Sequence, residues 1–327
     1  MIIISQTPYR VSLGGGGTDF AEWFSKNTGA TISFTIDKYN YTILKDLPPF
    51  FDNKFRLIYS NIEEVNSLNN IRHPLIKAVL KNYNVKNGFE IICSNDLPAK
   101  SGIGSSSSFA VSLINTLEYQ KSLKEISKIK LAKKAAYIER IKLKELGGYQ
   151  DQYAVSCGGL NFIKYTKNKI EVQSLRLNRR NLKIFEENCL MIFTNLTRIS
   201  SEVQKHKVKR LHLNKDVYKK MADNAVTIKD LLLAKKIDLN KIGNLINEGW
   251  EMKKKLSPKA SNKKLDRLLD ICRKNGSLGQ KIIGAGNGGF IFLLADKASQ
   301  KKILNSLKPT IFFNPKISFD GTKILKF

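Results

Sequence analysis

The sequence predicts an α+β protein with two domains, and three observations carry that prediction. With 327 residues, the chain is long enough for two domains of ordinary size. The expected strands and helices mix without the regular strand–helix–strand alternation that a doubly wound parallel sheet requires. Around 177–185 the chain becomes basic and loses its clear periodicity. We therefore expect one domain over residues 1–180 and a second over residues 181–327.

In the first domain, β-branched and aromatic residues predict strands, and apolar residues at three- and four-residue steps predict helices. Strands are expected at 2–5, 31–44 (as one strand or two), 55–59 and 89–93, and in a hairpin of 160–165 and 170–175. Helices are expected at 73–83, 105–120 and 125–146.

The second domain is expected to begin with a strand at 190–194 and to continue as a largely helical region from 201 to 275. The remaining elements are strands at 281–283 and 290–294, a helix near 297–307 and terminal strands. We find no internal repeats.

Composition indicates a folded protein without a membrane-spanning segment. Hydrophobic residues make up 42% of the chain, which is enough for a packed core. No apolar run approaches the roughly 20 residues that cross a membrane, and the start Met1-Ile-Ile-Ile-Ser lacks the features of a secretory signal. Four cysteines without a Cys-x-x-Cys pair fit reduced thiols in a cytoplasmic protein. Three scattered histidines are too few for a histidine metal site.

The formal net charge of +28 needs its own explanation. Nucleic-acid binding is one, but no helix-turn-helix, zinc-finger or RNA-recognition signature accompanies the lysines. The alternative is a lysine-rich composition that places lysine on every solvated face. We therefore expect no specific nucleic-acid partner and no membrane partner. The charge would still concentrate anionic small molecules within the ~8–10 Å that salt allows.

The Gly/Ser-rich run from Asp96 to Ser108 carries most of the functional signal. It opens directly into the helix expected at 105–120, so its serines lie at a helix N-terminus. Unpaired N–H groups and the helix dipole attract an anion there, and Gly102 and Gly104 let the backbone approach a phosphate closely. No Gly-Lys-Ser/Thr follows, so this is not a Walker loop. Taken alone, the run could also be a flexible linker.

Three further motifs accompany this loop, in the order Pro8–Asp19, Gly147–Tyr153 and Gly284–Gly289. Together with the loop, they resemble the GHMP kinase superfamily of galactokinase, homoserine, mevalonate and phosphomevalonate kinases, and the resemblance covers almost the whole chain. The Gly-Gly-Gly-Thr-Asp form of the first motif and the segment 194–202 look like the D-glycero-D-manno-heptose 7-phosphate kinases. L-fucose kinase has a similar first motif and is the nearest alternative.

The resemblance implies a fold, a reaction and a set of small-molecule partners. The expected fold pairs an N-terminal domain like ribosomal protein S5 domain 2 with a ferredoxin-like C-terminal domain. The expected reaction transfers phosphate from ATP, with Mg²⁺, to the anomeric hydroxyl of a sugar phosphate; an unphosphorylated sugar of the fucose or galactose type is the alternative acceptor. A homo-oligomer stays open.

The resemblance also assigns the residues that would bind ATP and its metal ion. Magnesium would be held by Ser106 and by Glu139, for which a solvated surface acid is the alternative. The residues expected to bind the ATP phosphates are Lys100, Ser101, Gly102, Ile103, Gly104, Ser105, Ser106, Ser107 and Ser108.

Asp151 is the expected catalytic carboxylate, beside the acceptor hydroxyl, and Arg10 of the first motif is expected nearby. Arg10 would stabilise charge on the transferring phosphoryl group. The alternative for Asp151 is a turn residue after Gly147 and Gly148.

Gly16, Gly17, Thr18 and Asp19 are expected to bind the sugar, because a carboxylate accepts hydrogen bonds from adjacent hydroxyls. Asp19 could also cap a helix that starts after it. Many relatives place proline soon after this aspartate, whereas Phe20 follows here.

Arg198, with Thr197 beside it, is expected to hold the sugar's own phosphate, since guanidinium pairs well with phosphate oxygens; a surface arginine is the alternative. The last motif, with Gly284, Gly286, Gly288 and Gly289, is expected to lie against the phosphate loop. Its alternative is a tight turn between two strands.

Overall fold

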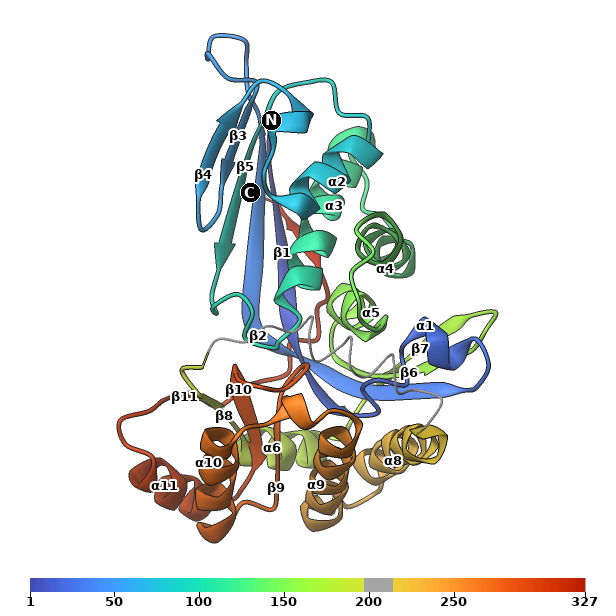
Figure 1. The fold of residues 1–327 in the computed structure, drawn as a ribbon, viewed down its shortest axis with the longest axis vertical. Helices are drawn as coiled ribbons and strands as arrows, with labels where there is room; N and C mark the ends of the chain where they lie inside the picture. Colours follow the sequence, from blue (N-terminus) through green and yellow to red (C-terminus); the bar gives the residue numbers. More distant parts are fainter. Residues whose placement is uncertain (197–213, 327) are drawn as a thin grey trace.

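The computed structural model describes residues 1–196 and 214–326 and confirms the α+β prediction (Figure 1). Among these residues the strands form two sheets, one of eight strands and one of four. The larger sheet and its helices occupy one end of the molecule, and the smaller sheet with its helices occupies the other. No helix within the described ranges is both long and apolar enough to cross a membrane.

Two long antiparallel strands organise the larger sheet. β1 pairs with β2 along nearly its whole length, and β2 then pairs with β5 through one half and with β6 through the other. β2 is thus a single strand, and β3 joins β5 in parallel. The strands of this sheet are β1 (Ile2–Gly14), β2 (Gly29–Asp46), β3 (Phe55–Ile58), β4 (Ile62–Val65), β5 (Phe89–Asn95), β6 (Leu160–Tyr165), β7 (Ile170–Leu175) and β12 (Lys323–Leu325).

Helices cover one face of the larger sheet and enclose an apolar core. The central helix α3 packs against β1 and β2, and its residues from Ser107 to Leu117 are buried. The core between helices and sheet includes Phe55, Val79 and Leu113. The helices of this half are α1 (Ala21–Phe24), the 3₁₀ turn η1 (Leu68–Asn70), α2 (Pro74–Asn82), α3 (Ser105–Ser122), α4 (Lys128–Ala136), the π-helical segment η2 (Tyr137–Lys142) and α5 (Gln150–Cys157).

The smaller sheet is antiparallel, in the order β11-β8-β10-β9. Its elements are α6 (Arg179–Asn188), β8 (Cys189–Phe193), α8 (Lys215–Leu233), α9 (Leu239–Leu256), the 3₁₀ turn η4 (Pro258–Ala260), α10 (Lys263–Lys274), β9 (Gly279–Ile282), β10 (Phe290–Leu294), α11 (Lys297–Ser306) and β11 (Ile311–Phe313). The chain then returns to the larger sheet, where β12 pairs with β1. The domain boundary near residue 180 stays a prediction. The last strand, β12, follows the second domain in sequence but belongs to the larger sheet of the first half.

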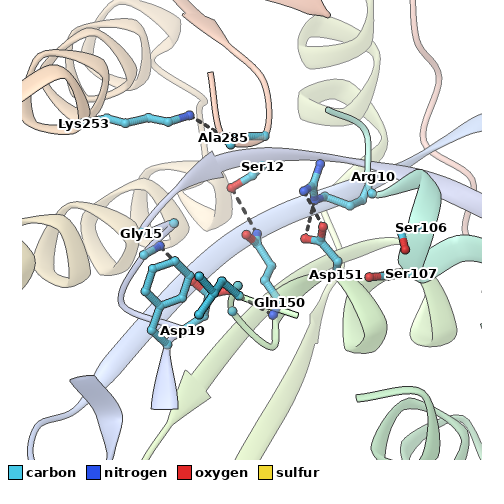
Figure 2. Close-up of a pocket in the computed structure, with 18 of the residues that line it drawn as sticks. Arg10, Ser12, Gly15, Asp19, Ser106, Ser107, Gln150, Asp151, Lys253 and Ala285 are labelled. Carbon is cyan, nitrogen blue, oxygen red and sulfur yellow. Dashed lines mark hydrogen bonds and ion pairs between the residues drawn. The ribbon is translucent and has the colours of Figure 1, made fainter. Parts of the chain in front are cut away.

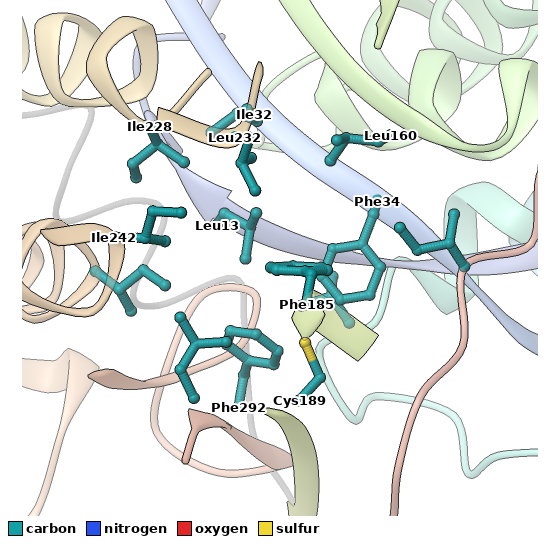
Figure 3. Close-up of a cluster of buried hydrophobic side chains, with 14 of the residues drawn as sticks. Leu13, Ile32, Phe34, Leu160, Phe185, Cys189, Ile228, Leu232, Ile242 and Phe292 are labelled. Atoms are coloured by element: carbon teal, nitrogen blue, oxygen red, sulfur yellow. The ribbon is translucent and has the colours of Figure 1, made fainter. Parts of the chain in front are cut away.

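A shared apolar core joins the two halves (Figure 3). Leu13 and Phe34 of the long strands meet Phe185 of α6, Ile228 of α8 and Phe292 of β10. All five side chains are essentially inaccessible to water. Because burial of such residues stabilises by roughly 1.5–3 kcal/mol each, this core holds the two halves in a defined relation.

Two helices differ from what the sequence pattern suggested. The segment around 177–185 was expected to lack periodic structure, but α6 runs through it, capped by the Asn178 side chain. Phe185 is buried in the core, and Leu182 and Ile184 pack against it, but the helix is short and begins with two arginines, so the basic composition hid the pattern. The helix expected over 125–146 ends as the π-helical segment at Lys142, and α5 follows after a loop.

Candidate active site

A pocket lies where the two halves of the molecule meet, and segments far apart in the sequence line it (Figure 2). The first half contributes the end of β1 and the following loop, the start of α3, and the loop before α5. The second half contributes α8, α9, β9 and the loop after β9. All four glycine-containing motifs therefore meet at one cavity, through Gly16, Gly17, Gly104, Gly147, Gly148 and Gly284.

The predicted phosphate loop ends at the uncapped N-terminus of α3. Gly104 is the N-cap residue, its φ is 77°, and no side chain caps this end. A Cβ at Gly104 would stand 3.4 Å from Oδ2 of Asp151. The left-handed backbone favours glycine here, and Gly104, Ser105 and Ser106 at this helix end line the pocket. An anion fits such a helix end.

Arg10 and Asp151 form an ion pair at the centre of the pocket. Nε and Nη2 of Arg10 donate to the two Asp151 oxygens at 2.8 and 2.7 Å. Nη1 donates to the carbonyl of Gly102 at 2.6 Å, and the backbone N–H donates to Ile103. The guanidinium thus fixes both the carboxylate and the phosphate loop. Asp151 lies in the first turn of α5, so its alternative as a turn residue is wrong.

Glu139 lines the pocket, and only 1% of the residue is exposed to solvent, which excludes the surface-acid alternative. Its oxygens accept hydrogen bonds from Ser106 at 2.9 Å, Ser107 at 2.8 Å and Gln152 at 2.5 Å. Among the described residues these partners are neutral, and no ion pair involves Glu139. A buried carboxylate next to a serine hydroxyl is an oxygen-donor set that suits a hard cation such as Mg²⁺. The π-helical turn that carries Glu139 is a rare conformation, frequent at functional sites.

Asp19 ties the first motif to the start of α5. Its carboxylate accepts from the N–H of Gly17 at 2.8 Å and of Gln150 at 3.1 Å. Burial raises the pKa of the Asp19 carboxyl above its ordinary value, while these two N–H groups act in the opposite direction. The expectation that Asp19 caps its own helix is wrong, because Phe20 is the N-cap of α1 and Asp19 turns to α5 instead.

Some predicted site residues lie behind the pocket surface. Thr18 is fully buried, and its hydroxyl bonds the carbonyls of Gly15 and Ala30, so it supports the loop; a sugar contact by Thr18 stays a prediction. Ser108 donates to carbonyls of β1, and Ser101 donates to Pro98. These side chains shape the loop, because their hydroxyls are directed to backbone carbonyls.

The last glycine motif lies against the phosphate loop and also forms the turn between β9 and β10. Phe290 N–H donates to the carbonyl of Ser101 at 3.3 Å. A Cβ at Gly289 would stand 2.0 Å from that same oxygen, and one at Gly288 would stand 2.6 Å from the carbonyl of Leu196. Gly286 likewise meets Ala260, whereas Gly284 lines the pocket. The last glycine motif therefore both contacts the phosphate loop and forms the turn between the two strands.

Sequence reasoning missed part of the pocket. Gln150 lies between Asp19 and Asp151 and donates to the Ser12 hydroxyl at 3.1 Å (Figure 2); its place next to Asp151 was the available signal. Lys253, Lys281 and Gly249 line the pocket on the side of the second domain, together with Met221, Gly284 and Ala285. In a chain with 56 lysines and arginines, no local pattern marks these two lysines. Thr197 and Arg198 lie outside the described residues.

Comparison with known proteins identifies two family models along the chain. Residues 70–159 match the GHMP kinases N terminal domain, and residues 228–310 match the GHMP kinases C terminal domain. A D-glycero-alpha-D-manno-heptose 7-phosphate kinase from Campylobacter jejuni is 31% identical over 94% of this chain and 93% of its own length. A bifunctional fucokinase/GDP-fucose pyrophosphorylase from Arabidopsis thaliana is 24% identical over 91% of this chain, which spans 30% of that longer protein.

Solved structures share the fold. A D-glycero-D-manno-heptose 1-phosphate kinase from Bacteroides thetaiotaomicron superposes with a TM-score of 0.79, covering 100% of this chain and 99% of its own, at 23% identity. At that identity the likeness shows the architecture, and it agrees with the two-domain α+β arrangement described above.

Proposed function

The chain belongs to the GHMP kinase family and is an ATP-dependent phosphotransferase acting on a sugar, and we propose that its acceptor is the anomeric hydroxyl of D-glycero-D-manno-heptose 7-phosphate. The product would be the 1,7-bisphosphate, a precursor for nucleotide-activated heptose. The choice of sugar is supported by the 31% identity to a heptose 7-phosphate kinase over nearly the whole chain.

One observation carries the proposed chemistry: Asp151 lies directly beside the N-terminus of α3 and forms an ion pair with Arg10. The helix end would hold the ATP phosphates, with the loop residues Lys100 to Ser108 around them. The acceptor hydroxyl would then lie between Asp151 and the γ-phosphate. This is the in-line arrangement that phosphoryl transfer needs.

In the proposed step, the anomeric oxygen forms a bond to the γ-phosphorus while the bond from that phosphorus to the bridging oxygen breaks, and ADP leaves. Asp151 orients the hydroxyl and receives its proton. Each carboxylate oxygen that accepts from Arg10 keeps a second lone pair for this purpose. Arg10 would stabilise the charge on the transferring group, and such stabilisation supplies most of the catalysis in this reaction class.

Ser106 and Glu139 are the proposed magnesium ligands, because they offer a hydroxyl and a buried carboxylate 2.9 Å apart. A bound Mg²⁺ would neutralise charge on the ATP phosphates. On the other side of Asp151, Asp19 with Gly16 and Gly17 would hold sugar hydroxyls, and Thr18 would support their loop from behind. Gln150 belongs to the same group, since its side chain lies between the two aspartates.

The proposal is tested by ATP consumption against a panel of free sugars and sugar phosphates, with Mg²⁺. Turnover confined to heptose 7-phosphate is the expected result. Turnover on L-fucose or galactose instead would replace the proposal with the unphosphorylated-sugar alternative. Arg198→Ala in the same assay tests the sequence-based expectation for Arg198: we expect it to weaken turnover of the sugar phosphate.

A further inference from the structure

The two oxygens of the Glu139 carboxylate have different hydrogen-bond partners. Oε1 accepts from the hydroxyl of Ser106 at 2.9 Å. Oε2 accepts from the hydroxyl of Ser107 at 2.8 Å and from the side-chain amide of Gln152 at 2.5 Å. Oε1 is therefore paired with the other proposed magnesium ligand, while Oε2 is engaged by two donors that are not proposed ligands.

Gln152 uses one amide nitrogen for two hydrogen bonds behind the pocket surface. The residue is fully buried. Its Nε2 carries two hydrogens and donates to Oε2 of Glu139 and, at 3.1 Å, to the Ser107 hydroxyl. Because an ionised carboxylate only accepts hydrogen bonds, the amide must present its NH₂ group to Glu139. Gln152 thus holds both the carboxylate and the serine that donates to it.

This small network joins three segments of the first domain. Ser107 belongs to α3, Glu139 to the π-helical segment η2, and Gln152 to α5, directly after Asp151. Figure 2 shows Ser106, Ser107 and Asp151 on the same side of the pocket. With Oε2 held from both helices, the Glu139 carboxylate cannot rotate without breaking two hydrogen bonds, so Oε1 stays beside Ser106.

We propose that Gln152 is a positioning residue that, together with Ser107, keeps Oε1 of Glu139 directed toward the divalent cation bound with ATP. This inference rests on the proposed function, because Ser106 and Glu139 are the magnesium ligands proposed there. Magnesium demands near-ideal octahedral geometry, so a carboxylate already held in one orientation binds it better than one that must be ordered on binding. Gln152 exerts this role through Glu139 and not through contact with a substrate.

The test measures metal affinity without turnover, in the full-length protein. Mn²⁺ replaces Mg²⁺, ADP is present, and the EPR signal of free Mn²⁺ gives the dissociation constant. Gln152→Met removes the amide donors and keeps the length of the side chain, and we expect the dissociation constant to rise about 10- to 100-fold. The Mg²⁺ concentration for half-maximal kinase activity should rise as well, with KM for the sugar unchanged. Gln173→Met, at an exposed position on β7, is the matched control and should bind Mn²⁺ like the wild type.

A double-mutant cycle separates positioning from a general structural effect. If Gln152 acts through Glu139, Gln152→Met should cause no further loss of Mn²⁺ affinity in a protein that already carries Glu139→Gln. A structural role would instead weaken Mn²⁺ binding by a similar factor in both backgrounds. That second result would overturn the inference.

Ser107→Ala keeps the test decisive if Gln152→Met loses its thermal unfolding transition and so fails to fold. Alanine is a better helix former than serine, and the backbone N–H at this position is kept. The change removes one donor to Oε2 and the hydroxyl that accepts from Gln152. We expect Mn²⁺ affinity to fall about tenfold, and to stay unchanged when the same substitution is made in the Glu139→Gln protein. Wild-type affinity in the Ser107→Ala protein would contradict the inference.

The outcomes separate this inference from the proposed function. If Glu139→Gln weakens Mn²⁺ binding but Gln152→Met and Ser107→Ala do not, the inference is wrong and the proposed metal site stands. If Glu139→Gln leaves Mn²⁺ binding unchanged, the proposed metal site is wrong and the inference falls with it. Because the binding experiment contains no sugar, the expected pattern would support the role of Gln152 even if the kinase assay identified a different acceptor.

Discussion

The two walls of the pocket differ in the kinds of residues that line them. The wall from the first domain consists of carboxylates, hydroxyls and glycines held in unusual backbone: Gly102 and Gly104 have positive φ, and Asp19 accepts two backbone N–H bonds. The wall from the second domain presents Met221, Gly249, Lys253, Lys281, Gly284 and Ala285, and among the described residues it contributes no carboxylate to the pocket lining. Because the carboxylates of the proposed transfer step come from the first wall, we expect changes in that wall to affect the transfer itself.

The distinction has a physical basis. Phosphoryl transfer requires donors within hydrogen-bond distance of a crowded, charged group, and this requires close backbone approach and fixed carboxylates. Changes in the first wall should therefore lower kcat for every sugar.

Asp151→Asn is the change with the largest expected effect on this comparison. Asparagine keeps the shape and one acceptor for Arg10 but cannot take up the hydroxyl proton. We expect kcat to fall by about 10²- to 10⁴-fold, and by the same factor for phosphorylated and free heptose. Steady-state kinetics with both sugars measures it, with the exposed Asp223→Asn as control. A loss limited to the phosphorylated sugar would contradict a direct role of Asp151 in the transfer.

Glu139→Gln should have the next largest effect, acting through the proposed metal. Glutamine can keep the hydrogen bonds to Ser106 and Ser107 but removes the buried charge. We expect activity at limiting magnesium to fall about 100-fold, with partial recovery as magnesium is raised. Titration of activity against Mg²⁺ measures the shift. Glu125→Gln, a variant of an exposed acid, should leave the titration where it is, and an unshifted curve for Glu139→Gln would remove Glu139 from the metal site.

The same contrast explains which parts of the site the sequence could predict. Arg10, Gly104, Ser106 and Asp151 belong to the glycine-containing motifs, and Glu139 was assigned from the family resemblance; the structure brings all five to one pocket. Lys253 and Lys281 resemble dozens of other lysines, so only the fold distinguishes them. The α+β class followed from the mixed order of strands and helices and the two-domain architecture from the family resemblance, whereas α6 was missed, because it is short and begins with two arginines in a basic stretch.

Asp19 shows a second limit of sequence reasoning. A helix-capping role was expected because an aspartate before an apolar run commonly caps a helix. In the structure the carboxylate instead bonds the N–H of Gln150, a residue 131 positions further along the chain. No local pattern contains a contact of that separation, since only the pairing of β1 with the rest of the sheet brings the two segments together.

Gly148→Ala tests how tightly the first wall is packed. A Cβ at Gly148 would stand 1.7 Å from Oδ2 of Asp19, so the carboxylate or the loop must move. We expect the free energy of unfolding to fall by about 1–3 kcal/mol, together with a higher KM for the sugar. Urea unfolding measures the first and kinetics the second. For stability, Gly16→Ala is the control, because its Cβ would meet only the Ser12 hydroxyl, at 3.8 Å. Equal free energies of unfolding for the two variants would show that the loop can move aside at little cost in stability.

The titration of Asp19 is expected to have the smallest of these effects. Its contributions to the free energy of unfolding and to sugar affinity should depend on pH in opposite directions. Burial raises its pKa in the folded protein, so the folded chain holds the proton more tightly than the unfolded chain. The contribution of Asp19 to stability is then fully present below the unfolded-state pKa and is lost as pH rises through the raised folded-state value. Sugar binding has the reverse dependence, because the ionised carboxylate is the better acceptor for hydroxyls.

KM for the sugar should therefore rise by a few-fold as pH falls from neutrality through the raised pKa of Asp19, while the ligand-free protein loses no stability from this group over the same range. Kinetics and thermal unfolding from neutral pH downward through the acidic range measure the two quantities on one preparation. Asp19→Asn should remove the pH dependence of KM at a uniformly weaker affinity. A wild-type KM that stays flat over this range would indicate that Asp19 is ionised throughout, held so by Gly17 and Gln150. The N–H groups of Gly17 and Gln150 would then fix the Asp19 carboxylate for the sugar, as the ion pair with Arg10 fixes Asp151 for the transfer.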